Sequence, residues 1–311
     1  MEGRSLIAPA TLAELPDPAP IGGPRETIPS VDWWVTSRCN LACDYCYGPV
    51  PGNDPVDLRV PILKAIARSS AQAVTFCGGE PLLVRLIDQY ANALRRLGKH
   101  TVLNTNGEIL RRRYGQGFKL SAFSMVGISI EGSTPEVHRA MGDQRADLDE
   151  VMKAIRLVAK EPGVQLKLAT VVSQVNRDDL SALAGVVRDL GPDVWRLYQY
   201  SRRGNQNIGQ FRHPVTEDEF EILVKEATSL AAPVLTAPST EAETEGCLIV
   251  DPSGNVLLPI RDRYVLRGNC LQEPLDQIWA DTVAQPTITR NKRWLSVLDQ
   301  PPARRTPRRP K

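Results

Sequence analysis

The chain has 311 residues, of which 42% are hydrophobic and 24% charged, enough for one large domain or a large domain with a smaller one. Its formal net charge of +2 gives no general case for binding nucleic acid or a membrane surface. No apolar run approaches the roughly 20 residues that span a bilayer, and the N-terminus lacks the basic and apolar regions of a signal peptide. We therefore expect a cytoplasmic globular protein.

The predicted elements begin after an irregular lead-in over residues 1–30, where six prolines fall between residues 8 and 30. From residue 31, short apolar runs alternate with longer amphipathic stretches, the pattern of βα units around a parallel sheet. Strands are predicted at 31–36, 73–76, 101–104, 125–130, 164–172 and 194–199, with helices near 57–69, 81–97, 147–160, 177–189 and 216–231. Six such units make an α/β fold, an open, partial (β/α)6 barrel over residues 31–235.

Three cysteines follow the first predicted strand. Cys39, Cys43 and Cys46 lie in the run CNLACDYC. Cysteine thiolates are the usual ligands of iron–sulfur clusters, and three of them leave one iron of a four-iron cluster open. As in a catalytic zinc site, a missing protein ligand leaves a coordination position for a small molecule. Reactive groups of βα barrels lie at the C-terminal ends of strands, where this loop belongs.

Zinc binding and disulfide bonding are the alternatives for these cysteines. Cys43 and Cys46 could form half of a structural zinc site, which needs a second close pair of Cys or His. The remaining candidates form no such pair in the sequence: Cys77, Cys247, Cys270, His100, His138 and His213. Disulfides are disfavoured because nothing else in the chain indicates secretion.

With its aromatic Tyr45, the motif resembles the Cys-x3-Cys-x-aromatic-Cys signature of the radical S-adenosylmethionine (SAM) superfamily. The resemblance covers about residues 31–235 and implies the same six-unit barrel with one [4Fe-4S] cluster, whose open iron chelates the amino and carboxylate groups of SAM. An electron from a reductant such as flavodoxin or ferredoxin then cleaves SAM to a 5′-deoxyadenosyl radical, which abstracts hydrogen from the substrate. The cofactors carry the difficult chemistry, and the protein supplies position and water exclusion.

A glycine-rich run follows the second predicted strand, consisting of Gly78, Gly79, Glu80 and Pro81. By itself it could be a turn before a helix, with Pro81 at the first helical position. Paired glycines also let a backbone come close to a ligand. In the superfamily a motif of this kind receives the SAM amino group, so the resemblance assigns these residues to cofactor binding.

Polar residues also follow the third and fourth predicted strands. Thr105 and Asn106 could belong to a simple turn and helix cap, but the resemblance places them beside SAM. Ser129 and Glu131 resemble the family's Ser-x-Asp/Glu segment, whose polar side chains face the ribose hydroxyls or the methionine end of SAM.

Two further cofactor-binding candidates come from the resemblance. Relatives often have an arginine near the SAM carboxylate at the position of Arg139, although an exposed helix arginine is the alternative. Val172, on the fifth predicted strand, would pack against the adenine, and core packing explains a valine there equally well.

The sixth predicted strand ends in Tyr198 and Gln199, and Arg202 follows in a basic loop. This segment resembles the equivalent strand of viperin-type and molybdopterin-synthase-type enzymes. The resemblance makes all three residues candidates for substrate binding. The alternative is a core strand followed by a solvated arginine loop.

Residues 236–290 are predicted to form a small α+β extension that begins with a hairpin over 247–259 and a Ser-Gly-Asn turn. They resemble the SPASM or twitch extensions of radical SAM enzymes, but Pro259 stands where that pattern has a cysteine. Cys247 and Cys270 alone are too few to hold a second cluster, so a cluster-free lid is expected. Either could be a catalytic hydrogen donor, or simply a small buried hydrophobe.

Residues 291–311 form a basic Pro/Arg-rich stretch, predicted to be a solvated tail. The function predicted for the chain is radical abstraction of hydrogen from a small polar metabolite in a biosynthetic pathway, leading to epimerisation or dehydrogenation. A sugar, an aminoglycoside or a nucleoside would qualify. The alternatives are a maturase that modifies a ribosomally made peptide and, from another class, a non-catalytic metal-binding protein.

Overall fold

The structure is a computed structural model that describes residues 27–49, 52, 54–200, 213–240, 247–260 and 263–284. Most of the predicted lead-in and all of the predicted tail lie outside these residues. None of the helices in the described part of the chain combines the length and the apolar composition needed to cross a membrane.

Six parallel strands form the body of the fold, and they correspond to the six predicted strands. They are β1 (Ser30–Thr36), β2 (Ala73–Gly78), β3 (His100–Thr105), β4 (Met125–Ser129), β5 (Gln165–Val172) and β6 (Val194–Gln199). Each strand pairs in parallel with the next along the chain. The predicted α/β class with a parallel sheet is therefore confirmed.

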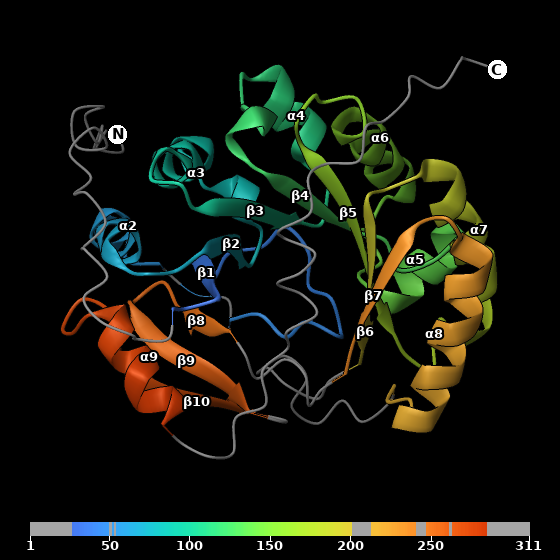
Figure 1. Ribbon diagram of the computed structural model, residues 1–311. Coiled ribbons are helices and arrows are strands. Elements are labelled where there is room, and N and C mark those ends of the chain that lie inside the picture. The colour runs from blue at the N-terminus through green and yellow to red at the C-terminus, as the bar shows by residue number, and fades with distance from the viewer. Residues whose placement is uncertain are drawn as a thin grey trace.

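The connecting helices lie on the outer side of the curved sheet (Figure 1). They are α2 (Arg59–Arg68), α3 (Ile87–Arg96), α4 (Leu110–Gly115), α5 (Pro135–Met141), α6 (Leu148–Val158), α7 (Leu180–Leu190) and α8 (Glu217–Ala231). Short 3-10 turns occur at η1 (Val56–Leu58), η2 (Pro81–Leu83), η3 (Leu120–Ala122) and η4 (Arg177–Asp179). Side chains of Thr134, Asp147 and Thr216 accept backbone N–H groups at the starts of α5, α6 and α8, which is why those helices begin there.

The C-terminal extension continues the same sheet instead of forming a separate layer. The strand order is β10-β9-β8-β1-β2-β3-β4-β5-β6-β7. Here β7 (Leu235–Ser239) lies parallel to β6 and β8 (Leu248–Val250) parallel to β1, while β9 (Asn255–Ile260) and β10 (Arg263–Asn269) are antiparallel, followed by α9 (Leu275–Val283). The predicted hairpin is present as β8–β9. Strand β7 has no counterpart among the predicted strands, because it is short and contains Pro238, which an edge position tolerates.

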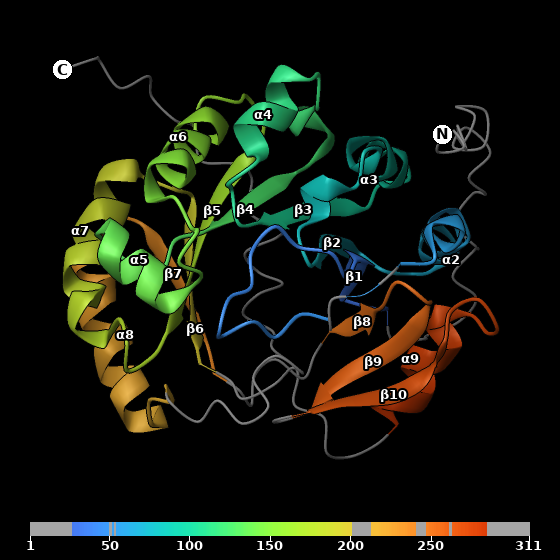
Figure 2. The same ribbon diagram turned by 180° about the vertical axis from the view of Figure 1, so that it is seen from behind.

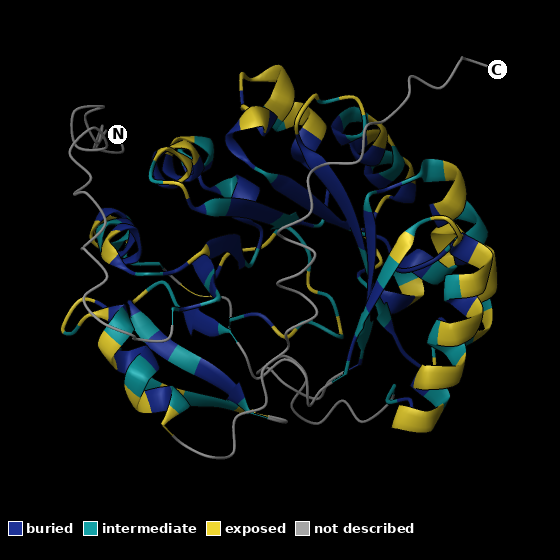
Figure 3. Ribbon diagram, in the orientation of Figure 1, coloured by how far each residue is buried: buried dark blue, intermediate teal, exposed yellow. Residues whose placement is uncertain are grey.

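The main core lies between the sheet and the outer helices, where most strand residues are buried (Figure 3). Val31, Trp33 and Val35 of β1 are wholly buried in it, and the Trp33 ring lies 5.5 Å from that of Phe76. Because successive side chains of a strand point to opposite faces, the alternate residues of β1, Asp32 and Trp34 among them, face the concave side of the sheet. That side holds the polar groups described below.

Candidate functional site

The loop that follows β1 runs on the inner side of the curved sheet (Figure 2), and the three cysteines belong to this loop. Cys39 is exposed, and Cys43 and Cys46 are partly exposed. The backbone N–H of Leu41 lies 3.5 Å from the Cys39 sulfur, and that of Gly48 lies 3.4 Å from the Cys46 sulfur. Two of the three thiols on the loop, those of Cys39 and Cys46, therefore already receive backbone donors.

Asp54 fixes the base of this loop. Its carboxylate accepts hydrogen bonds from the Thr36 hydroxyl and from the Ser37 N–H and hydroxyl, the last two at 2.7 Å. Arg59 pairs with it at 3.1 Å. Burial raises the pKa of Asp54, but the hydrogen bonds and the Arg59 charge outweigh burial and hold it below its usual value. An ionised Asp54 thus joins the end of β1 to the start of α2.

The paired glycines lie against the backbone of the cysteine loop. The N–H groups of Gly79 and Glu80 donate to the carbonyls of Thr36 and Arg38, both at 2.8 Å. A Cβ at Gly79 would lie 2.1 Å from the Arg38 carbonyl oxygen. Gly78 has a φ of +120°, which favours glycine. Only glycine fits this close approach of two backbones.

The Glu80 side chain links the C-terminal ends of β2 and β3 through hydrogen bonds. Its carboxylate accepts from the Leu82 N–H at 2.9 Å, the Thr105 hydroxyl at 2.8 Å and the Asn106 N–H at 3.0 Å. Burial raises the pKa of Glu80 to about 7 despite these donors. The Asn106 amide in turn donates to Asn40 at 3.0 Å. The structure therefore brings Glu80, Thr105 and Asn106 together beside the cysteine loop, and their contact with SAM stays a prediction.

Glu131 has protein partners that the sequence did not indicate. The Tyr45 hydroxyl donates to one carboxylate oxygen at 2.9 Å, and the Val171 N–H donates to the other at 2.8 Å. The side chain is buried, and burial raises its pKa to about 7. Ser129 is partly exposed at the end of β4. The carboxylate thus links the cysteine loop to β4 and β5.

Val172 lies differently from its expected role, and the expected role of Arg139 near SAM stays a prediction. Arg139 forms a helix-surface ion pair with Glu136 at 3.6 Å. Val172 is wholly buried in the main core, and its neighbour Val171 is the partly exposed one. Side chains of a strand alternate between its faces, so the expected contact of Val172 with adenine is corrected to core packing.

The concave face of the sheet carries two buried cations. Lys167 of β5 and Arg196 of β6 are 1% and 5% exposed. The Lys167 ammonium donates to Asn104 at 2.7 Å. A Cβ at Gly127 would lie 2.3 Å from Lys167 Cε, so the glycine makes room for this side chain.

Tyr198 and Asp32 share this face with the cations. Arg196 Nε lies 3.3 Å from the Tyr198 hydroxyl, and its guanidinium lies 4.9 Å from the ring centroid. Burial raises the pKa of Tyr198, but Arg196 and Lys167 outweigh burial and lower it. Burial also raises the pKa of Asp32, against the influence of Thr75 and Lys167. A layer of mutually interacting ionisable groups therefore lines the concave face.

The predicted substrate-binding residues have different positions. Tyr198 belongs to the concave layer. Its neighbour Gln199 donates to the Val215 carbonyl at 3.1 Å and so braces the segment before α8. Arg202 lies outside the described residues.

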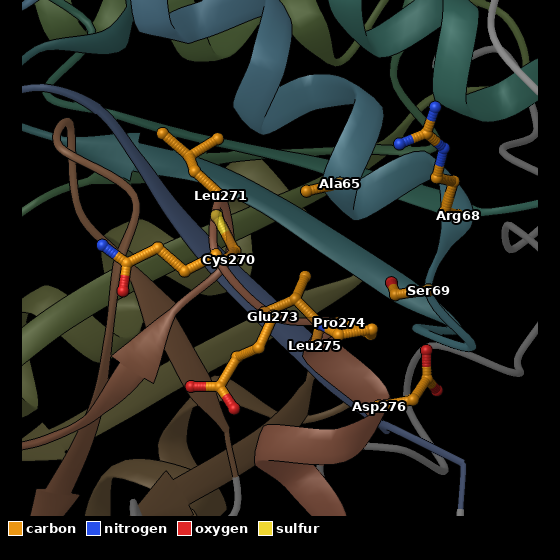
Figure 4. Close-up of a pocket in the computed structure, with 10 residues that line it drawn as sticks. Ala65, Arg68, Ser69, Cys270, Leu271, Glu273, Pro274, Leu275 and Asp276 are labelled. Carbon is orange, nitrogen blue, oxygen red and sulfur yellow. The ribbon is translucent and has the colours of Figure 1, made fainter.

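The two cysteines of the extension are also separated. The Cys247 sulfur lies 3.8 Å from an Asp32 oxygen, near the concave layer. Cys270 is buried and lines a pocket between the end of α2 and the segment before α9 (Figure 4). Its N–H donates to the Gly254 carbonyl at 2.8 Å. Burial raises the pKa of the Cys270 thiol to about 12.

Sequence reasoning missed Asp32, Lys167 and Arg196 as members of a site. Their signal is visible in retrospect, since each interrupts an otherwise apolar strand. A charged residue on a strand buried on both faces needs a partner or a ligand.

A family model described as the Radical SAM superfamily matches residues 34–184. The matched range begins in β1, contains the cysteine loop and ends in α7. It ends before the extension, so the SPASM or twitch likeness of residues 236–290 stays a prediction.

Curated relatives and solved structures are also similar to the chain. An S-adenosylmethionine-dependent nucleotide dehydratase from Lacinutrix mariniflava is 28% identical over 244 residues, which cover 73% of this chain and 50% of the relative. A GTP 3′,8-cyclase from Aquifex aeolicus is 27% identical over 202 residues, covering 61% of this chain and 62% of the relative. SuiB from Streptococcus suis, solved bound to S-adenosylmethionine, has a TM-score of 0.62 at 14% identity, covering 82% of this chain and 66% of SuiB. The last likeness concerns the fold alone, and the chain spans only part of the length of each relative.

Proposed function

This chain belongs to the radical SAM superfamily, and on that premise we propose that it is an enzyme that abstracts hydrogen from a small anionic metabolite. Enzymes of this superfamily use a [4Fe-4S] cluster and SAM. The observation that carries the substrate class is the pair of buried cations, Lys167 and Arg196, on the concave face of the sheet.

The residues of the cysteine loop fit the cluster. Cys39, Cys43 and Cys46 are three at least partly exposed thiols on one loop. In the described part of the chain no three Cys, His, Asp or Glu side chains converge on a single metal ion, and in a four-iron cluster each cysteine ligates a different iron. When bound, the cluster and SAM supply the radical that removes the hydrogen atom.

Other residues of the site hold the cofactor-binding surface in place. The Gly78 and Gly79 backbone leaves no side chain between the cysteine loop and the end of β2. The Glu80 carboxylate holds Thr105 and Asn106 in place by accepting hydrogen bonds from the Thr105 hydroxyl and the Asn106 N–H. Rigid placement of this kind matters because a reacting atom must be held within a short distance of its target.

The buried cations favour an anionic substrate group. Lys167 interacts electrostatically with Tyr198, Arg196 and Asp32 on this face. Charges in a low-dielectric site act strongly on a bound ligand. The positive charges of Lys167 and Arg196 would attract a phosphate group of the substrate, whereas a cationic aminoglycoside would be repelled.

A phosphorylated nucleoside is the preferred member of this class. Two relatives are named for nucleotide chemistry, a nucleotide dehydratase and a GTP cyclase. Of the two candidate hydrogen donors, Cys247 is the better placed, because its sulfur lies 3.8 Å from Asp32 of the concave layer. The thiols also suit a reducing cytoplasm with a flavodoxin or ferredoxin as reductant.

The test measures 5′-deoxyadenosine by mass spectrometry after anaerobic reconstitution, reduction and addition of SAM. Nucleoside triphosphates, sugar phosphates, the unphosphorylated compounds and peptides are added separately. We expect phosphorylated compounds to stimulate 5′-deoxyadenosine formation, and Lys167→Gln to abolish that stimulation while leaving the iron content unchanged. Stimulation by peptides alone, or equal stimulation by phosphorylated and unphosphorylated compounds, would contradict the proposed substrate class.

A further inference from the structure

A buried carboxylate holds the cysteine loop from a distant part of the chain. Asp143 follows α5, and its Oδ2 accepts a hydrogen bond from the backbone N–H of Ala42 at 2.6 Å, across 101 residues of sequence. Ala42 lies between Cys39 and Cys43. The Asp143 side chain is 7% exposed. This contact therefore sets the position of the loop segment that carries two of the three thiols.

The segment around Asp143 also packs directly against the loop. A Cβ at Gly142 would lie 3.7 Å from the Cys43 sulfur, which is ordinary contact distance. A local turn alone would explain a hydrogen bond from Arg145 N–H to Asp143, which is present at 2.8 Å. It would not explain why the carboxylate turns inward to a loop 101 residues away.

Arg145 supplies the opposite charge at the same place. Its Nε and a terminal nitrogen contact the two oxygens of Asp143 at 2.9 Å and 2.5 Å, a bidentate pair. The Arg145 side chain is 65% exposed, and Cys39 and Cys43 are among its electrostatic neighbours. A negative and a positive group thus lie together at the edge of the thiol loop.

We propose that Asp143 and Arg145 are a positioning pair that holds the cysteine loop and keeps its surroundings neutral, thereby setting the reduction potential of the cluster held there. The inference rests on the proposed function, because it requires a cluster on these thiols. Cluster potentials depend on net charge, hydrogen bonds to the sulfurs and solvent exposure. An uncompensated carboxylate beside the cluster opposes the arrival of an electron, and an uncompensated guanidinium favours it.

If the two charges compensate each other, removing either one should shift the reduction potential of the cluster, and the two shifts should have opposite signs. Asp143→Asn keeps an oxygen for the Ala42 N–H but removes the negative charge, so the potential should rise. Arg145→Gln leaves the carboxylate uncompensated, so the potential should fall. The reduction potential of the double variant should lie between those of the two single variants. Lys153→Gln is the matched control, because it breaks a 2.7 Å surface ion pair with Glu150 on α6 and should leave the potential unchanged.

The experiment is an anaerobic redox titration of the full chain with a reconstituted cluster, followed by electron paramagnetic resonance without SAM. Iron content and circular dichroism confirm that each variant is loaded and folded. Shifts of the same sign in both single variants, or no shift in either, would overturn the pairing. Failure of the unsubstituted chain to take up any four-iron cluster would instead contradict the proposed function, so the two failures are distinguishable.

Discussion

The hydroxyl of Tyr45 donates a hydrogen bond of 2.9 Å to the carboxylate of Glu131, across 86 residues of sequence. The other Glu131 oxygen accepts the Val171 N–H. The aromatic residue between the second and third cysteines is therefore also a tether, which ties the cysteine loop to β4 and β5. A phenylalanine at this position could supply the ring but not the tether.

Tyr45→Phe tests the tether. It removes the donor and leaves a buried carboxylate oxygen with one partner fewer, which costs roughly 1–3 kcal/mol of folding free energy. We expect a lower midpoint in denaturant unfolding and faster loss of iron to a chelator. Tyr114→Phe is a suitable control, because Tyr114 is 41% exposed on α4. Equal stability of Tyr45→Phe and the unsubstituted chain would show that the bond contributes nothing.

Glu131 predicts a pH dependence of stability. Burial raises its pKa to about 7 from an ordinary 4.5. The folded chain holds the Glu131 proton more tightly than the unfolded chain does. Its contribution to the free energy of unfolding is therefore fully present below about pH 4.5 and is lost as the pH rises through about 7. Glu131→Gln removes the titration. The free energy of unfolding of the unsubstituted chain, minus that of the variant, should therefore decrease from about pH 5 to about pH 8. A constant difference would contradict the raised pKa.

Gly79→Ala should dismantle the cofactor site. The added Cβ would lie 2.1 Å from the Arg38 carbonyl oxygen, a backbone atom that cannot move without displacing the cysteine loop. We expect iron content after reconstitution to fall several-fold. Gly115→Ala at the end of α4 is the control, because its Cβ meets nothing within 4 Å. Full iron loading of Gly79→Ala would show that the two backbones can separate without loss of the site.

Gly127→Ala should disturb the substrate face alone. Its Cβ would lie 2.3 Å from Lys167 Cε, so the flexible lysine must leave its hydrogen bond to Asn104. Loss of one charged hydrogen bond to the substrate should raise the substrate concentration needed for half-maximal 5′-deoxyadenosine formation roughly tenfold. Iron content should not change. Gly185→Ala on α7, which meets only an arginine tip at 3.9 Å, is the control.

Iron analysis tests the extension. Cys247 lies near Asp32 and Cys270 lies against α2, so the structure does not bring the two together as ligands. We expect about four irons per reconstituted chain, the content of one cluster. A double Cys247→Ala, Cys270→Ala variant should keep that content, and Cys39→Ala should lose most of it. About eight irons per chain would contradict a cluster-free extension.

The sequence by itself determined the elements whose signals are local. The cysteine spacing, the paired glycines and the six apolar runs each lie within a short stretch, and the structure places the glycines beside the cysteine loop. Parallel sheets bring the C-terminal ends of their strands to one edge. Glu80, Thr105 and Asn106 could therefore be grouped from the sequence, because each lies at or just after the C-terminal end of a strand.

Only the tertiary structure decided which residues of those strands face the concave side. Strands of a parallel sheet are buried on both faces, so their sequences are nearly continuous apolar runs without a visible alternation. Register placed Lys167 and Arg196 inward and Val172 in the outer core, and it separated Tyr198 from Gln199. The bonds from Tyr45 to Glu131 and from Ala42 to Asp143 span 86 and 101 residues. No local pattern encodes such contacts, because they form only when the curved sheet brings the C-terminal ends of distant strands close together.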